Sequence, residues 1–107
     1  MSRRQIRFAR PLAYHAAMEK RQFTRIAKAL ADPRRFEILQ QIASEEEVSC
    51  AAVKECHEVT PATLSHHLKE LESAGLVEVR KESKYVYLSL QRPAWKAYLK
   101  ELKKIGR

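Results

Sequence analysis

Side chains that could contact a nucleic acid are concentrated in one segment of the chain, from Val59 to Leu90. The first part of this segment contains threonine, serine and histidine, whose polar atoms can bond to base edges in the major groove. The later part contains lysine and arginine, which can bind phosphate. We therefore expect a DNA-contacting surface made of Thr60, Ala62, Thr63, Ser65, His66, Lys69, Arg80, Lys81 and Lys84.

The sequence predicts one helix that would carry the first of these residues. Thr60 is a good N-cap and Pro61 suits the first helical position. Leu64, Leu68 and Leu71 follow at i, i+4 and i+7, which makes one apolar stripe for the core. The other side of the helix would then enter the major groove, with backbone N–H groups near Ala62 free to meet a phosphate. His67 shares the stripe, so we expect a partly buried packing residue rather than a base contact.

Gly75 is expected to end this helix, because a residue without Cβ readily takes the left-handed conformation of a helix C-terminus. Two alternating runs follow and predict a short β-hairpin. Val77 and Val79 share a face of the first strand, and the second strand presents Tyr85 and Tyr87 on one face and Val86, Leu88 and Leu90 on the other. The residues between the runs, 80–84, form a polar turn with three cations, as expected of a wing that meets phosphate.

Further helices are predicted on both sides of this unit. An amphipathic helix covers about Ala13 to Leu30, and Asp32-Pro33 begins a second one. Residues 44–47 form an acidic surface turn, and Ser49 caps a short helix that ends near Cys56. With a last helix after Pro93, the fold class is mainly α with a small β-hairpin: a winged helix-turn-helix of five helices and a two-stranded wing.

The last helix carries one continuous apolar stripe and needs a surface to pack against. One partner is the protein's own core, which would cover half of the stripe. The other is a second copy of the chain, since winged-helix proteins bind paired half-sites as two-fold dimers. We expect a homodimer formed by the first and last helices through Phe23, Trp95, Tyr98, Leu99, Leu102 and Ile105.

The 107 residues suffice for a single domain, 1–107, preceded by a basic arm over about residues 1–12. The net charge of +8 is localised, because residues 1–35 hold ten Lys or Arg against two acids. A basic end favours a polyanionic partner, although a solvated helix face would look the same. The start of the chain has no apolar run typical of a signal peptide or a membrane span, so we expect a cytoplasmic protein with no membrane partner.

Two segments together resemble the ArsR/SmtB-type winged-helix transcriptional regulators. They are Leu-Ala-Asp-Pro-Arg-Arg, at 30–35, and Ser-His-His-Leu-Lys-Glu-Leu-Glu-Ser-Ala-Gly-Leu-Val, at 65–77. The resemblance covers about residues 20–100. It implies a homodimeric repressor, dimerised by its first and last helices, which occludes a promoter until an inducer lowers its DNA affinity.

Many members of that family sense metals, but the ligands they use are missing from this sequence. The cysteine pair expected after the second helix falls near residues 48–52, where only Cys50 is present. The last helix, 93–105, has neither His nor Asp and only one acid, Glu101, so the second family site is absent too. We expect no metal site and no cofactor.

Cys50 and Cys56 are left as possible redox residues. On one helix they would lie about 120° apart and about 9 Å apart along the axis, which prevents a shared metal and disfavours a disulfide between them. Incidental cysteines and a thiol-responsive switch both remain open.

Two other function classes compete with DNA binding. One is a winged helix that contacts another protein. The other is an enzyme, which the sequence disfavours because it shows no catalytic set of Ser, His and Asp or of Cys and His, and no glycine-rich phosphate loop. No motif identifies an inducer or an operator.

Overall fold

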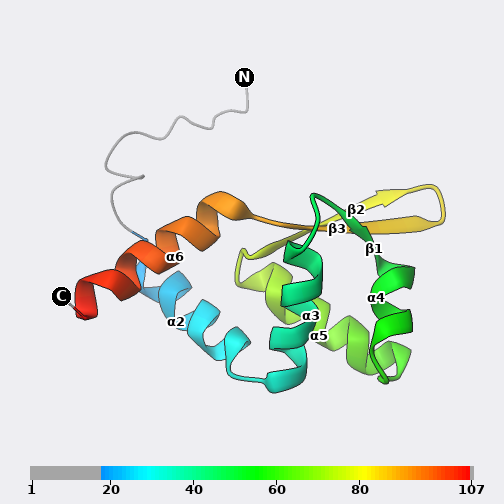
Figure 1. Ribbon diagram of the computed structural model, residues 1–107, viewed down its shortest axis with the longest axis horizontal. Helices are drawn as coiled ribbons and strands as arrows, with labels where there is room; N and C mark the ends of the chain where they lie inside the picture. Colours follow the sequence, from blue (N-terminus) through cyan, green and yellow to red (C-terminus); the bar gives the residue numbers. More distant parts are fainter. Residues whose placement is uncertain (1–17, 107) are drawn as a thin grey trace.

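The computed structural model describes residues 18–106, and Figure 1 shows how its elements are arranged. Their order is α2 (Lys20–Leu30), α3 (Pro33–Ala43), β1 (Val48–Ser49), α4 (Cys50–Cys56), α5 (Pro61–Ser73), β2 (Val77–Glu82), β3 (Tyr85–Leu90) and α6 (Arg92–Ile105). Helices α2 and α6 lie at one end of the molecule and the β2–β3 hairpin projects from the other. Helices α3 and α5 lie between these ends.

Local side-chain caps begin three of the helices, as the sequence predicted. The Asp32 carboxylate accepts a hydrogen bond from the Arg35 amide at 2.9 Å, at the start of α3. Ser49 Oγ accepts from the Ala52 amide at 3.1 Å, and Thr60 Oγ1 accepts from the Thr63 amide at 3.1 Å. These bonds satisfy N–H groups that have no partner within the helix, so the caps fix where α3, α4 and α5 begin.

The first helix starts later than predicted in the part that can be compared. Met18 and Glu19 precede the helix, Glu19 has an extended backbone, and α2 begins at Lys20. Residues 13–17 of the predicted helix, and the basic arm at about 1–12, lie outside the described residues.

The sheet has three strands instead of the predicted two, in the order β1-β3-β2. Strand β1 pairs antiparallel with β3, placing Val48 opposite Leu88 and Ser49 opposite Tyr87. A strand of two residues is too short to show the alternation by which strands are recognised in a sequence. The wing turn is also shorter than residues 80–84, because pairing continues to Glu82 and Tyr85 and leaves only Ser83 and Lys84 to turn. Ser83 takes a left-handed φ of 59° there.

The core joins one face of each helix to the inner face of the sheet. The residues with no exposed side-chain surface come from five different elements and the link after α5: Ile26, Ile38, Ile42, Val53, Leu71, Leu76 and Leu88. The predicted stripe of α5 is buried, with Leu64, Leu68 and Leu71 between 0% and 9% exposed. This packing fixes which side of α5 faces outward.

The end of α5 is closed by Gly75 at a φ of 82°, as predicted. The Leu76 amide donates to the Leu71 carbonyl at 3.0 Å. From α2, Gln22 Nε2 donates to the Ala74 carbonyl at 3.2 Å and passes directly over Gly75. A Cβ at position 75 would lie 2.7 Å from this nitrogen, so both the backbone conformation and the neighbouring side chain favour glycine.

Gly75→Ala should therefore lower the free energy of unfolding by about 1–2 kcal/mol, as measured by urea denaturation. Gly106→Ala is the matched control, since a Cβ there meets nothing within 4 Å and the φ is −94°. Equal stabilities for the two variants would contradict this role of Gly75.

Candidate nucleic-acid interface

Helix α5 presents a polar face to solvent opposite its buried stripe. Thr60, Ala62, Thr63, Ser65, His66 and Lys69, all predicted to contact DNA, are exposed. At about 100° per residue, most of them lie within about 60° of His66, whereas the buried leucines lie on the far side. The structure therefore brings Ala62, Thr63, His66 and Lys69 together on one surface, while Ser65 and Thr60 are exposed about 100° or more away from His66 around the axis.

The hydroxyl groups at the start of α5 bond to each other. Thr60 Oγ1 accepts from the Thr63 amide and also donates to Thr63 Oγ1, at 2.9 Å. The Thr60 hydroxyl is thus occupied as a cap. The hydroxyl proton of Thr63 remains free to donate outward, so Thr63 is the better placed of the two for a base edge.

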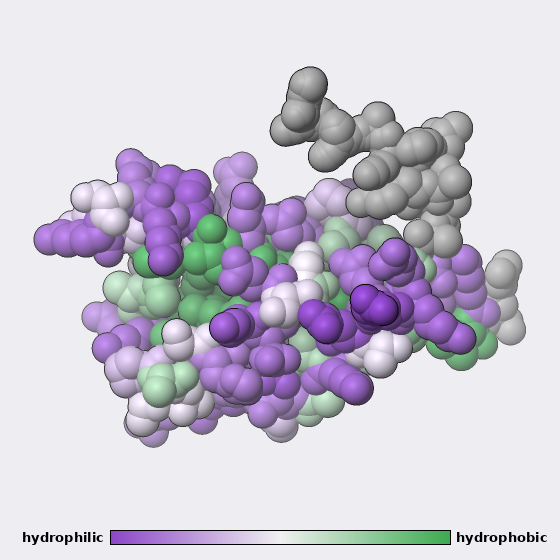
Figure 2. All heavy atoms as spheres, turned by 180° about the vertical axis from the view of Figure 1, so that it is seen from behind, coloured by the Kyte–Doolittle hydropathy of each residue, from purple (hydrophilic) through white to green (hydrophobic). Residues whose placement is uncertain are grey.

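The wing places its two lysines differently from its arginine. Lys81, near the end of β2, and Lys84, in the turn, are both exposed, and Lys84 Nζ lies 5.6 Å from the centre of the Tyr85 ring. The back view in Figure 2 shows a hydrophilic wing tip and apolar side chains gathered at its base. The tip can therefore offer positive charge to a phosphate.

Arg80 lies within β2 and not in the turn where the sequence placed it. Its guanidinium holds the Glu47 carboxylate through two hydrogen bonds, at 3.0 and 2.9 Å, and donates to Glu82 at 2.6 Å. It also lies 4.7 Å from the centre of the Tyr87 ring. The hydrogen bonds from Arg80 lower the pKa of the Glu47 carboxyl. The hydrogen bonds to Glu47 and Glu82 in turn raise the pKa of Arg80. Arg80 thus anchors the wing to the loop before β1.

Arg35 is a positioning residue that the sequence analysis did not identify. Its Nε donates to the Ala29 carbonyl at 2.8 Å, near the end of α2, and its Nη1 donates to His67 Nδ1 at 3.2 Å. An arginine is always a donor, so His67 must accept at Nδ1 and is neutral. His67 is 6% exposed, as the apolar stripe predicted. One side chain from α3 therefore joins the end of α2 to α5.

The electrostatic surroundings of His67 agree with this geometry. Burial is the largest cause of a pKa below its ordinary value, and the positive charge of Arg35 adds to the effect. The Asp32 carboxylate acts in the opposite direction. Protonation would place a donor against the Arg35 guanidinium, which is why the buried ring stays neutral.

The residues expected to dimerise fall into two groups. Phe23 of α2 packs on Tyr98 of α6 with ring centres 5.1 Å apart, and Trp95 lies 6.1 Å from Tyr98. These three rings pack in the protein's own core, although the sequence analysis assigned them to the dimer contact and left the core as the alternative for half of the stripe. The other half faces outward: Leu99 is 45% exposed, Leu102 39% and Ile105 76%.

The two cysteines lie at opposite ends of α4, as predicted. Cys50 is partly buried, and burial raises the pKa of its thiol, which disfavours the reactive thiolate. Cys56 is exposed, and its Sγ lies 3.4 Å from Gln41 Nε2. Among residues 18–106, no group of three or more His, Cys, Asp or Glu side chains is arranged to hold a metal ion. No helix in the same range is long and apolar enough to cross a membrane.

The sequence matches known proteins in the region of this site. Residues 30–80 match the family model described as a helix-turn-helix domain. The uncharacterized HTH-type transcriptional regulator YceK of Bacillus subtilis is 39% identical over 75 residues, which are 69% of this chain and 75% of that protein. The arsenical resistance operon repressor of Staphylococcus xylosus is 37% identical over 71 residues, 65% of this chain and 67% of that protein.

Solved structures share the fold. An ArsR-like transcriptional regulator from Rhodococcus superposes with a TM-score of 0.71 at 23% identity, over 80% of both chains. The homodimeric winged helix-turn-helix domain of Mb0332 from Mycobacterium bovis, a possible ArsR-family regulator, has a TM-score of 0.62 at 30% identity, over 83% of this chain and 89% of that one.

An exposed polar helix beside a wing and the matches in sequence define a DNA-binding transcriptional regulator. The chain belongs to the ArsR family of winged helix-turn-helix regulators, as its two motifs indicated. Proteins of this class are not enzymes, in agreement with the sequence analysis.

The neutral state of His67 makes stability depend on pH. Because the folded pKa lies below the ordinary value of 6.5, the unfolded chain binds the proton more readily. The free energy of unfolding should fall as the pH is lowered from about 7 to about 5, and His67→Gln, which keeps an acceptor for Arg35, should reduce this fall. His66→Gln, at the exposed neighbouring histidine, is the control in the same urea titrations. A fall of equal size in the His67 variant and the wild type would contradict the assignment.

Proposed function

We propose that the protein is a homodimeric, sequence-specific repressor of the cytoplasm that acts as a single domain and occludes a promoter. The observation that carries this proposal is the exposed polar face of α5, held by packing and by Arg35 beside a wing with a cationic tip. The similarity to an arsenical resistance operon repressor supports the repressor mode.

In this proposal α5 lies in the major groove and supplies the base contacts. Thr63 and His66 would read base edges, and Ser65 would contact the DNA from the other edge of this face, while Thr60 and Ala62 bring the start of the helix close to a phosphate. The helix has no arginine, so it offers no guanidinium to pair with guanine. Much of the affinity would therefore come from phosphate contacts.

Lys69, Lys81 and Lys84 are the cations that we assign to phosphate in this unit. All three are exposed, and none of them forms an ion pair within residues 18–106. Arg80 is assigned to holding the wing in place, because both Glu47 and Glu82 already neutralise it.

The dimer would form through the outward half of the α6 stripe, Leu99, Leu102 and Ile105. Their exposure in a single chain is the supporting observation, since burying large apolar side chains is what stabilises obligate interfaces. A two-fold dimer would present two copies of α5 to two half-sites, and the homodimeric state of the Mycobacterium bovis domain agrees with this arrangement.

Base contacts and phosphate contacts should respond differently to substitution. Thr63→Ala or His66→Ala should weaken binding to the specific site by about 1–3 kcal/mol and binding to random DNA much less. Lys81→Ala should weaken both kinds of DNA alike and reduce the slope of log K against log salt by about 1. The measurement is a fluorescence anisotropy titration against the protein's own upstream DNA and a random duplex.

These titrations also separate the competing functions. Equal losses on specific and random DNA for both classes of variant would contradict the assignment of α5 as the reading helix. A folded dimer with no DNA affinity would favour protein contact, and binding that is lost on oxidation would favour a switch at Cys56 or Cys50.

The dimer is tested by replacing its proposed contact residues with a polar side chain. Leu99→Gln/Leu102→Gln should raise the dimer dissociation constant about 30-fold, from about 2 kcal/mol of lost apolar burial. Lys100→Gln/Lys103→Gln, with the same spacing on the same helix, should leave it unchanged. Sedimentation equilibrium measures both, and a dimer that tolerates the leucine changes would overturn this interface.

A further inference from the structure

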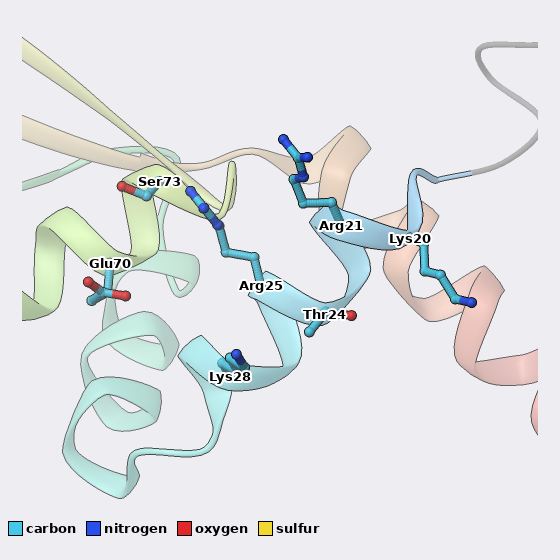
Figure 3. A pocket seen from close by; sticks show the side chains of 7 residues that line it. All are labelled: Lys20, Arg21, Thr24, Arg25, Lys28, Glu70 and Ser73. Carbon is cyan, nitrogen blue, oxygen red and sulfur yellow. The ribbon is translucent and has the colours of Figure 1, made fainter.

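A groove lined mainly by cations runs between α2 and the end of α5. Its volume is about 630 Å³, and its lining residues are Lys20, Arg21, Thr24, Arg25 and Lys28 of α2 with Glu70 and Ser73 of α5. Figure 3 shows Arg25 extending from α2 toward Ser73. A second hollow, of about 280 Å³, shares Arg21, Arg25 and Ser73 and includes Gly75 at the helix end.

The cations of this groove have no acidic partner in the described part of the chain. Ion pairs within residues 18–106 join Arg34 to Glu37, Arg80 to Glu47 and Glu82, and Lys104 to Glu101. None includes Lys20, Arg21, Arg25 or Lys28. Glu70 is the one acidic residue that lines the groove, so the four positive charges on this helix face outnumber it and favour an external anion.

The groove opens on the same side of α5 as the proposed base contacts. Ser73 is seven residues after His66 and four after Lys69, so it lies within about 40° of both around the helix axis and about 10 Å beyond His66. Glu70 is also within about 40° of His66. The side of α5 that we assign to DNA therefore also lines the groove.

Helix α2 lies between α5 and α6, so the position of the groove relative to DNA depends on both of these helices. Gln22 bonds to the carbonyl of Ala74 at the end of α5, and the next residue, Phe23, packs on Tyr98 of α6. The wing lies at the opposite end of the molecule (Figure 1). If α6 forms the dimer contact, the groove faces the DNA between the two half-sites.

We propose that this groove binds the DNA phosphate backbone between the half-sites, with Arg25 and Lys28 as its main ligands. The proposal rests on the proposed function, since it needs α5 in the major groove and α6 at the dimer axis. The Glu70 carboxylate repels phosphate, so the backbone is held on the α2 side of the groove. The groove thus extends each protomer's footprint toward the dimer axis and adds affinity that is independent of base sequence.

The test compares two double variants that remove the same charge. Arg25→Gln/Lys28→Gln alters the groove, and Lys100→Gln/Lys103→Gln removes two cations at the same spacing from α6. The slope of log K against log salt should fall by about 2 per protomer in the groove variant, equally on upstream and random DNA, and stay unchanged in the control. Thermal denaturation of both variants verifies that they fold as the wild type does.

Ethylation interference on the upstream DNA then locates the contact. Ethylated phosphates between the half-sites should block the wild type and no longer affect the groove variant. The groove proposal is overturned if both double variants change the slope equally, or if the central phosphates behave alike for wild type and groove variant. A wild type that binds upstream and random DNA equally would instead overturn the proposed function, whatever the groove variant does.

Discussion

One guanidinium group joins α5 to two other helices, beside the leucine packing that buries the inner side of α5. Arg35, in the first turn of α3, bonds to the carbonyl of Ala29 at the end of α2 and to the ring of His67 in α5. Its own amide is held by the Asp32 cap. Three helices meet at this side chain, and the three hydrogen bonds are partly buried. The leucine stripe and this side chain together hold the inner side of α5, which leaves its outer side free for the base contacts that we propose.

A second guanidinium, that of Arg80, holds the wing against the rest of the fold. Arg80 ties β2 to Glu47, in the loop before β1, and β1 is itself paired with β3. The hairpin is therefore braced at its base and leaves Lys81 and Lys84 exposed at its tip. Within residues 18–106, cations thus serve in two ways: Arg35 and Arg80, bound to carbonyls or carboxylates, hold elements together, whereas Lys81 and Lys84 are exposed and form no ion pair.

Much of the fold could be predicted because its signals are local. The caps at Asp32, Ser49 and Thr60, the leucines of α5 and the stop at Gly75 each depend on residues a few positions apart. The missing parts depend on distant contacts. The bond from Arg35 to His67 spans 32 positions and the pair of Arg80 with Glu47 spans 33. Neither contact can be recognised from the spacing of neighbouring residues. Strand β1 exists only through its pairing with β3.

If α5 reads DNA as proposed, its outer surface distinguishes one DNA sequence from another. The most direct measurement is equilibrium binding of the unaltered protein to its own upstream DNA and to a scrambled duplex of equal length and composition, near physiological salt. We expect a preference of about 1,000-fold or more for the upstream DNA. Equal affinities for the two duplexes, in a folded dimer, would contradict it.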